Sequence, residues 1–267
     1  MIKIIFSDMD GTLLTDENNL PEGFDEIISE LKKRGVIFAP TSGRQYFSLI
    51  KSFPKYLDEF MFLSDNGTLA TYRGKEIFSQ PMELEDAEKI LKVGESLENV
   101  MSVFCGKKNA YILEEQNIPK YTDELNIFFT KNVVVKNWRE VDDVPIKVSF
   151  FDPTGKTAQK VYPHFKKFSA DHKVVLASDY WTDVTAPDAS KGTAVKNVQK
   201  ILNIKPEECA AFGDYLNDYE MMKAVGYSFA MKNAHPDLKK VAKFETVSNN
   251  DFGVIVGIKK LMAENLI

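Results

Sequence analysis

The sequence FSDMDGTLL (residues 6–14) directly follows an apolar run at residues 2–5. The run is rich in β-branched side chains, which predicts a buried strand. Asp8 and Asp10 come at its end, and residues at i and i+2 of a strand point to the same side. If the extended geometry persists, both carboxylates face one spot, where one would take up a proton unless a cation lies between them. The stretch therefore predicts a strand that ends in an acidic site.

Strand-like and helix-like segments alternate outward from this stretch. Residues 22–33 carry apolar side chains at helical spacing, and residues 36–44 are apolar and then end in small polar residues. Residues 60–67 repeat that scheme, and the same alternation resumes from residue 190 to the end of the chain. Three strands with polar tips predict a parallel sheet with crossover helices, in which ligands gather at the carboxyl ends of the strands.

The middle of the chain follows a different pattern. Its strand-like segments are short and are often separated by turns, which predicts a smaller sheet with helices on one face. We therefore predict an α/β protein with a Rossmann-like parallel-sheet core at residues 1–82 and 188–267. An inserted α/β domain is predicted at residues 83–187.

Composition excludes several classes of function. Hydrophobic residues make up 44% of the chain and charged residues 27%, as in ordinary soluble proteins. The net charge of −5 gives no reason to expect nucleic acid or an anionic membrane as a partner. No apolar stretch approaches the ~20 residues that span a bilayer, and the N-terminus lacks a signal-peptide pattern. With two cysteines that show no metal-like spacing, we expect a cytoplasmic protein, either a monomer or a weak homo-oligomer.

Polar tips that follow the core strands would meet at one edge of a parallel sheet. They lie at residues 8–12, 41–44, 190–192 and 213–218. If a helix runs through the last tip, Asp214 and Asp218 are at i and i+4 on one face, with Asn217 beside them. Carboxylates that converge there need compensation, and a hard divalent cation such as Mg²⁺ prefers oxygen ligands.

Two other side chains at these tips suit an anionic ligand. Lys191 offers a compact positive charge, and Ser42 with nearby backbone amides can donate to phosphate oxygens. Ser42 could also be a loop hydroxyl whose role Thr41 shares, and Ser190 could serve only as a helix cap. Taken together, the tips predict a metal-assisted phosphate site that binds a small phosphorylated metabolite.

The motifs DMDGTLL, TSGR, SKG and GDYLND, in this order, resemble the four motifs of the haloacid dehalogenase superfamily of phosphohydrolases. The long insertion between the second and third motifs, together with the SDNG tip at residues 64–67, is similar to the Cof-type subfamily with its large α/β (type IIB) cap. The resemblance covers the whole chain. A single motif is weak evidence, whereas the ordered set is specific.

The resemblance implies a role for each matching residue. Asp8 would attack phosphorus and form an aspartyl phosphate, and Asp10 would act as general acid and base. Mg²⁺ would be held by Asp8, the main-chain carbonyl of Asp10 and Asp214. The phosphoryl group would be bound, and the site supported, by Ser42, Gly43, Lys191, Asn217, Asp218 and Thr12. Asp218 could equally be a hydrogen-bond acceptor behind the ligands.

We accordingly expect a Mg²⁺-dependent phosphatase that hydrolyses small phosphorylated metabolites, sugar phosphates above all, through an aspartyl-phosphate intermediate. One alternative is a phosphotransferase or phosphomutase that passes the phosphoryl group to a sugar hydroxyl. Another is a catalytically silent, metabolite-binding regulator, although the intact carboxylates and lysine argue against it.

Overall fold

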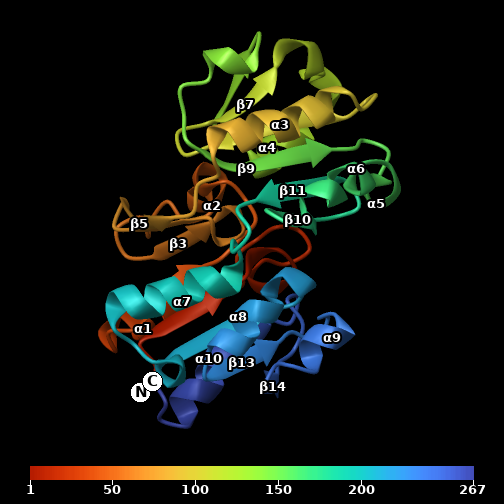
Figure 1. The fold of residues 1–267 in the computed structure, drawn as a ribbon. Helices are drawn as coiled ribbons and strands as arrows, with labels where there is room; N and C mark the ends of the chain where they lie inside the picture. The colour runs from red at the N-terminus through yellow and green to blue at the C-terminus, as the bar shows by residue number, and fades with distance from the viewer. The chain divides into compact units, whose positions relative to one another are not determined.

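The computed structural model describes residues 1–267, which divide into two compact units. Unit 1 comprises Met1–Ser42, Phe53–Ile77 and Ser190–Ile267, and unit 2 comprises Gly43–Ser52 and Phe78–Ala189. Figure 1 shows that strands from both ends of the chain, red and blue, build the sheet of unit 1. The middle of the chain, from yellow through green to teal, builds the sheet of unit 2.

Unit 1 is built on a parallel sheet with the strand order β14-β13-β12-β1-β2. In chain order the strands are β1 (Ile4–Ser7), β2 (Ile37–Pro40), β12 (Cys209–Gly213), β13 (Tyr227–Ala230) and β14 (Phe244–Glu245). β1 lies between β12 and β2, and all four of its residues are buried. The sequence prediction of a parallel-sheet core is confirmed.

Helices alternate with the strands of unit 1 along the chain. They are α1 (Phe24–Lys33), α7 (Lys191–Leu202), α8 (Tyr219–Ala224), α9 (Pro236–Lys239) and α10 (Gly253–Ala263). α7 packs beside α8, and α1 packs beside α10. The apolar stripe of α1, which includes Ile27 and Leu31, is buried as its helical spacing predicts.

One strand of unit 1 departs from the expected parallel arrangement. β3 (Met61–Ser64) pairs antiparallel with β4 (Leu69–Tyr72), which continues into β5 (Lys75–Ser79). The parallel contact of β3 with the core sheet is a single bridge between Thr41 and Leu63. The reason lies in the next turn, residues 65–67, where three successive positive φ angles of 51°, 57° and 88° turn the chain back into a hairpin.

Unit 2 contains a six-stranded sheet in the order β10-β11-β9-β6-β7-β8. The strands are β6 (Met101–Gly106), β7 (Ala110–Leu113), β8 (Asn132–Val135), β9 (Pro145–Phe151), β10 (Lys173–Leu176) and β11 (Trp181–Thr185). Neighbours pair antiparallel except β7 and β8, which are parallel. Its first face packs against Ile90 and Leu91 of α3 (Leu84–Glu95), in a core that includes Val148 and Phe150.

The chain between β9 and β10 forms two short helices and a turn in place of one continuous helix. α5 (Thr157–Lys160) and α6 (Tyr162–Phe165) are followed by a 3-10 turn at Lys166–Phe168. Pro163 lacks a backbone N–H and its ring excludes a continuous α-helix through this point. α6 still contributes Phe165, which stacks on Phe150 with ring centroids 4.0 Å apart.

The second face of this sheet is covered as well, so the expectation of helices on one face only is wrong. Phe129, which follows α4 (Thr122–Phe128), packs on Trp181 with ring centroids 5.5 Å apart. Its ring also lies 5.4 Å from Nζ of Lys147. Lys147 and Trp181 are almost fully buried, and alternate residues of a strand point to opposite faces, so this face also needs a covering layer.

The segment around α2 (Tyr46–Lys51) groups with unit 2, although it was expected in the core. Gln45 donates to the carbonyl of Lys131 at 3.1 Å, and the hydroxyl of Ser48 donates to the carbonyl of Phe128 at 2.8 Å. The predicted boundaries of the inserted domain, residues 83–187, stay a prediction. As for membranes, every helix falls short of the length and apolar character that a bilayer-spanning helix requires.

An aromatic cluster in unit 1 generates a stability prediction. Phe60 is 2% exposed and its ring contacts Phe24, Phe38, Phe53, Tyr56 and Phe62. Phe60→Ala should lower the free energy of unfolding by about 3–5 kcal/mol, because a buried ring is replaced by a cavity. Urea unfolding followed by circular dichroism measures the loss.

The matched control is Leu57→Ala, since Leu57 is 38% exposed in the same segment. It should change the free energy of unfolding by no more than about 0.5 kcal/mol. Equal losses in the two variants would contradict the assignment of Phe60 to the core.

Candidate active site

The carboxyl ends of three neighbouring strands form one edge of the sheet in unit 1. The amide of Asp8 donates to the carbonyl of Phe212 at 3.0 Å, and the amide of Thr41 donates to the carbonyl of Ser7 at 2.8 Å. These bonds continue the ladders of β1 with β12 and β2 beyond the strands. The polar residues that follow each strand are therefore brought to the same edge, as the sequence predicts.

Asp8 sits where the chain leaves the extended conformation. β1 ends at Ser7, and the carboxylate Oδ1 of Asp8 accepts from the amide of Met9 at 2.7 Å, which caps a short helical turn. Asp8 is buried, whereas Asp10 is exposed. The extended geometry does not persist through this segment, because a helical turn begins at Met9. The negative charge of Asp10 still acts on Asp214, where it helps to raise the pKa.

Lys191 supplies the positive charge beside Asp8. Its Nζ lies 2.6 Å from Oδ1 of Asp8 and 2.7 Å from Oδ1 of Asp218, and its side chain is 1% exposed. Lys191 is the first residue of α7, whose N-terminus is capped by Ser190 through the amide of Thr193 at 3.0 Å. Ser190 thus has the capping role that was considered for it, and the cap fixes the start of the helix that carries Lys191.

Asp218 anchors the loop after β12. Its Oδ2 accepts from the amides of Asp214 at 3.0 Å and Tyr215 at 3.3 Å, and its side chain is fully buried. β12 ends at Gly213, and α8 begins only at Tyr219. Asp214 and Asp218 therefore do not share a helix face, which corrects the expected i, i+4 arrangement. They are close because the side-chain carboxylate of Asp218 accepts a hydrogen bond from the backbone amide of Asp214.

Residues of the turn after β1 hold the side chain of Asp214 in place. The hydroxyl of Thr12 donates to its Oδ1 at 2.7 Å, and its main-chain carbonyl accepts from the amide of His235 at 2.7 Å. A Cβ on Gly11 would lie 2.5 Å from Oδ2 of Asp214. That approach and the positive φ of Gly11, 72°, together favour glycine here, because a larger residue would be strained and would displace the Asp214 carboxylate. Thr12 and Gly11 thus position Asp214 from a segment about 200 residues away.

Three carboxylates meet in this way. Asp8, Asp214 and Asp218 each offer an oxygen, and these oxygens lie within 4.8 Å of one another. With Lys191 as the one ammonium group in contact, the ionised cluster carries a net charge of −2, from three negative charges and one positive. An all-oxygen donor set with that charge fits a hard divalent cation. The side chain of Asp10 is not among the three.

Burial sets the protonation of the cluster. Burial raises the pKa of Asp214 to about 6, with a further contribution from the negative charge of Asp218. Burial likewise raises the pKa of Asp8 well above its ordinary value, although Lys191 opposes the shift. For Lys191, burial works against the charged form, but Asp218 and Asp8 outweigh it and the pKa is raised. The lysine is therefore charged, and burial disfavours the ionised forms of Asp8 and Asp214, an effect that a bound cation would offset.

The other predicted residues have less direct geometry. Ser42 is buried at the end of β2, where its amide donates to the carbonyl of Leu63 at 2.9 Å. Gly43 belongs to unit 2, and its carbonyl accepts from Nζ of Lys147 at 3.0 Å. Asn217 is half-buried in the turn that ends at Asp218. Phosphate binding by these three residues stays a prediction.

Sequence reasoning missed one residue that supports the site. Nδ2 of Asn233 donates to the carbonyl of Gly11 at 2.7 Å, and its Oδ1 accepts from the amide of Asn249 at 3.2 Å. Asn249 in turn donates to the carbonyl of Leu14 at 3.0 Å. The signal was available, because Asn233 follows β13, and β13 is the neighbour of β12 in a parallel sheet.

Comparison with known proteins gives a consistent picture. A sequence model that describes haloacid dehalogenase-like hydrolases matches residues 5–258. The 5-amino-6-(5-phospho-D-ribitylamino)uracil phosphatase YbjI of Escherichia coli strain K12 is 29% identical, over 98% of this chain and 96% of the relative. Phosphatase YwpJ of Bacillus subtilis strain 168 is 28% identical, over 98% and 100% of the two chains.

Solved structures agree with the sequence relatives. SMU.1108c from Streptococcus mutans UA159 has a TM-score of 0.87 at 25% identity and covers 98% of this chain and 100% of its own. The subclass IIB sugar phosphatase BT4131 has a TM-score of 0.82 at 21% identity, with 99% and 100% covered. The second likeness shows that the fold is shared.

The raised pKa of Asp214 predicts a pH dependence of stability. Folded Asp214 titrates near pH 6, against an ordinary value of 3.8, so between these values the folded state binds more protons than the unfolded state. The contribution of Asp214 to stability is fully present below its ordinary pKa of 3.8 and is lost as the pH rises through its folded-state pKa of about 6. With a chelator present to remove metal ions, the free energy of unfolding of the wild type should fall by up to about 1.4 kcal/mol per pH unit relative to that of Asp214→Asn.

Urea unfolding of both proteins from about pH 4 to about pH 7 measures this difference. Asp58→Asn, which changes an exposed carboxylate in the same unit, should follow the wild type throughout. A constant difference between the wild type and Asp214→Asn would show that Asp214 has no raised pKa.

Proposed function

This chain belongs to the haloacid dehalogenase-like hydrolases and is a phosphomonoester hydrolase, and we propose that it hydrolyses small phosphorylated metabolites through an aspartyl phosphate on Asp8 with the aid of Mg²⁺. The observation that carries this proposal is the buried contact of Asp8 with Lys191 beside Asp214 and Asp218. A carboxylate held next to a fixed ammonium group and a cation site can approach an anionic phosphate.

Asp8 is proposed as the nucleophile because of how its oxygens are used. Lys191 and the amide of Met9 both contact Oδ1. These contacts favour the ionised carboxylate and fix its orientation, and they leave Oδ2 to attack phosphorus. The alcohol leaves, and the phosphoryl group is carried as an acyl phosphate until water displaces it from the carboxylate.

Asp10 is proposed as the general acid and base. It lies two residues beyond the nucleophile, on the same turn, and it is exposed, so it can exchange protons with solvent. It would protonate the leaving alkoxide in the first step and take a proton from the attacking water in the second. The surroundings of the two carboxylates differ as their proposed tasks do, since Lys191 contacts Asp8 whereas Asp10 is open to solvent.

Lys191 is proposed to bind the transferred group as well. An ammonium group has three donor protons, and Asp8 and Asp218 account for two. The third can donate to a phosphoryl oxygen. Ser42, Gly43 and Asn217 complete the proposed phosphate-binding set, with Asp218 and Thr12 holding Lys191 and Asp214 in place.

The residues present fit a resident Mg²⁺. Asp8, Asp214 and the main-chain carbonyl of Asp10 would hold it, and Asp218 stays engaged by Lys191 and two amides. When bound, Mg²⁺ supplies positive charge that offsets the charge of the phosphoryl oxygens. The buried carboxylates would release protons as the ion binds, because metal ligands must be deprotonated.

For the substrate, we propose a sugar or sugar-alcohol phosphate. The relative YbjI is named for a phosphorylated ribitylamino-uracil, which is a sugar-alcohol phosphate that also bears a pyrimidine ring. That compound and hexose phosphates are the first to test, ranked by kcat/KM. Analysis of the products in the presence of free sugars separates hydrolysis, which yields inorganic phosphate, from transfer to a sugar hydroxyl.

Asp8→Asn should lower kcat for p-nitrophenyl phosphate by on the order of 10³-fold or more, because an amide cannot act as the nucleophile. Phosphate release with Mg²⁺ present measures the rate. Asp58→Asn is the matched control and should retain wild-type turnover. Substantial activity in a folded Asp8→Asn protein would reject Asp8 as the nucleophile.

Mg²⁺ should raise the melting temperature of the wild type, since a ligand that binds the folded state stabilises it by about 2.7 kcal/mol at 100 times its Kd. Asp214→Asn should lose most of this rise, and Asp142→Asn, a solvent-exposed change in unit 2, should keep it. Thermal unfolding with and without Mg²⁺ provides the test without any substrate. An equal rise in all three proteins would place the ion elsewhere.

A further inference from the structure

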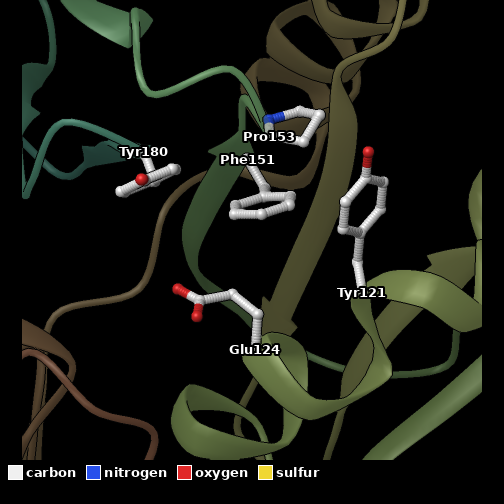
Figure 2. A pocket seen from close by; sticks show the side chains of 5 residues that line it. All are labelled: Tyr121, Glu124, Phe151, Pro153 and Tyr180. Atoms are coloured by element: carbon white, nitrogen blue, oxygen red, sulfur yellow. The ribbon is translucent and has the colours of Figure 1, made fainter.

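Unit 2 contains a cavity of about 330 Å³ that the proposed chemistry does not use. Tyr121, Glu124, Phe151, Pro153 and Tyr180 line it. Figure 2 shows the two tyrosine side chains on opposite sides of Phe151, with the carboxylate of Glu124 directed toward the space between the rings. This volume is near the lower end of the range of small-molecule sites, ~300–1,000 Å³, so the cavity can hold a ring with its substituents.

The rings form a shaped apolar surface. Phe151 is 4% exposed and packs on Trp181 with ring centroids 4.9 Å apart, so it is a fixed base of the cavity. The ring of Tyr180 lies at 22° to that of Phe151, with centroids 6.3 Å apart. Tyr121 meets Phe151 edge-on, with 5.4 Å between centroids and 67° between planes. Aromatic faces arranged in this way favour a flat partner.

Glu124 gives the cavity its one charged group. The indole N–H of Trp181 donates to its Oε1 at 3.2 Å, which fixes the carboxylate next to the rings. A carboxylate in contact with a ligand can only accept hydrogen bonds, so the ligand must present donors. The side chain is half-buried, which strengthens a charge-assisted hydrogen bond relative to one on the open surface.

We propose that this cavity binds a planar nitrogen heterocycle that presents N–H donors, such as an amino-substituted uracil. A sugar ring would need several donors and acceptors for its hydroxyls, and the lining offers one carboxylate and two phenolic hydroxyls. A lone ammonium head would fill little of the volume. A flat ring with adjacent N–H groups uses both the aromatic faces and the carboxylate.

The ring that binds this cavity can belong to either of two molecules. It can be part of the phosphorylated substrate, in which case the inference rests on the proposed function, or it can be a free molecule that binds unit 2. The ring site itself depends only on residues of unit 2, so binding can be tested without turnover.

Isothermal titration calorimetry of the full chain with 5,6-diaminouracil tests the site. We expect saturable binding of one molecule per chain, weakened at least about fivefold by Glu124→Gln, which keeps an acceptor for Trp181 but removes the charge. Tyr180→Ala should weaken it by a similar factor, and Tyr180 is exposed enough (46%) to tolerate the change. Asp123→Asn removes an exposed carboxylate from the neighbouring position of α4 and should bind within about twofold of the wild type.

Absence of saturable binding to the wild type would overturn the proposal, and so would equal affinity in Glu124→Gln, Asp123→Asn and the wild type. Binding of free ribitol in place of the diaminouracil would also overturn it, since the site would then recognise the chain of hydroxyls.

Turnover then identifies the source of the ring. We compare kcat/KM for 5-amino-6-(5-phospho-D-ribitylamino)uracil with that for ribitol 5-phosphate, which lacks the ring. The ratio of the first kcat/KM to the second measures the preference for the ring. If this ratio falls at least about fivefold in Glu124→Gln but not in Asp123→Asn, the ring is carried by the substrate. An unchanged ratio with weakened diaminouracil binding supports a free molecule. If the wild type binds the diaminouracil but hydrolyses neither of these compounds nor p-nitrophenyl phosphate, the proposed function fails while the ring site stands.

Discussion

The buried ammonium group of Lys191, 2.6 Å from Asp8 and 2.7 Å from Asp218, is the contact on which the rest of the site depends. Each of these charges would be costly to bury alone, and removing one partner would leave the others uncompensated. The contact therefore fixes the N-terminus of α7 against the ends of β1 and β12. It also leaves an excess of negative charge for the proposed Mg²⁺ to offset, because one lysine cannot neutralise three carboxylates and burial drives Asp8 and Asp214 toward their protonated forms.

Sheet topology is what brings these groups together. Asp8 and Asp218 are 210 positions apart, but β1 and β12 are parallel neighbours, so their carboxyl ends coincide. The close approach of Gly11 to Asp214, and the hydrogen bond from Thr12, then join the two turns into one structure. The chemistry we propose uses this arrangement, in which Oδ1 of Asp8 contacts both Lys191 and the amide of Met9. The second unit adds an aromatic cavity with a single carboxylate, a chemistry unlike that of the acidic edge.

Much of this arrangement could be predicted from residues alone. The apolar stripe of α1 and the alternation of elements identified the parallel core, and the ordered motifs placed Asp8, Lys191 and Asp214 at one edge. The different exposures of Asp8 and Asp10 could not be predicted, because they depend on where the chain turns after Ser7. The hairpin after β3 depends on three left-handed residues, and the grouping of α2 with unit 2 depends on hydrogen bonds to residues about 80 positions away. Local patterns carry no information on such distant partners.

The account depends most on the claim that Asp8 carries the phosphoryl group. Reduction of the enzyme with borohydride during turnover would convert an aspartyl phosphate into homoserine, which peptide mass spectrometry locates by residue. The account predicts homoserine at position 8, only when both substrate and Mg²⁺ are present. Homoserine at position 10 or 214, or none in a preparation that is turning over substrate, would contradict it.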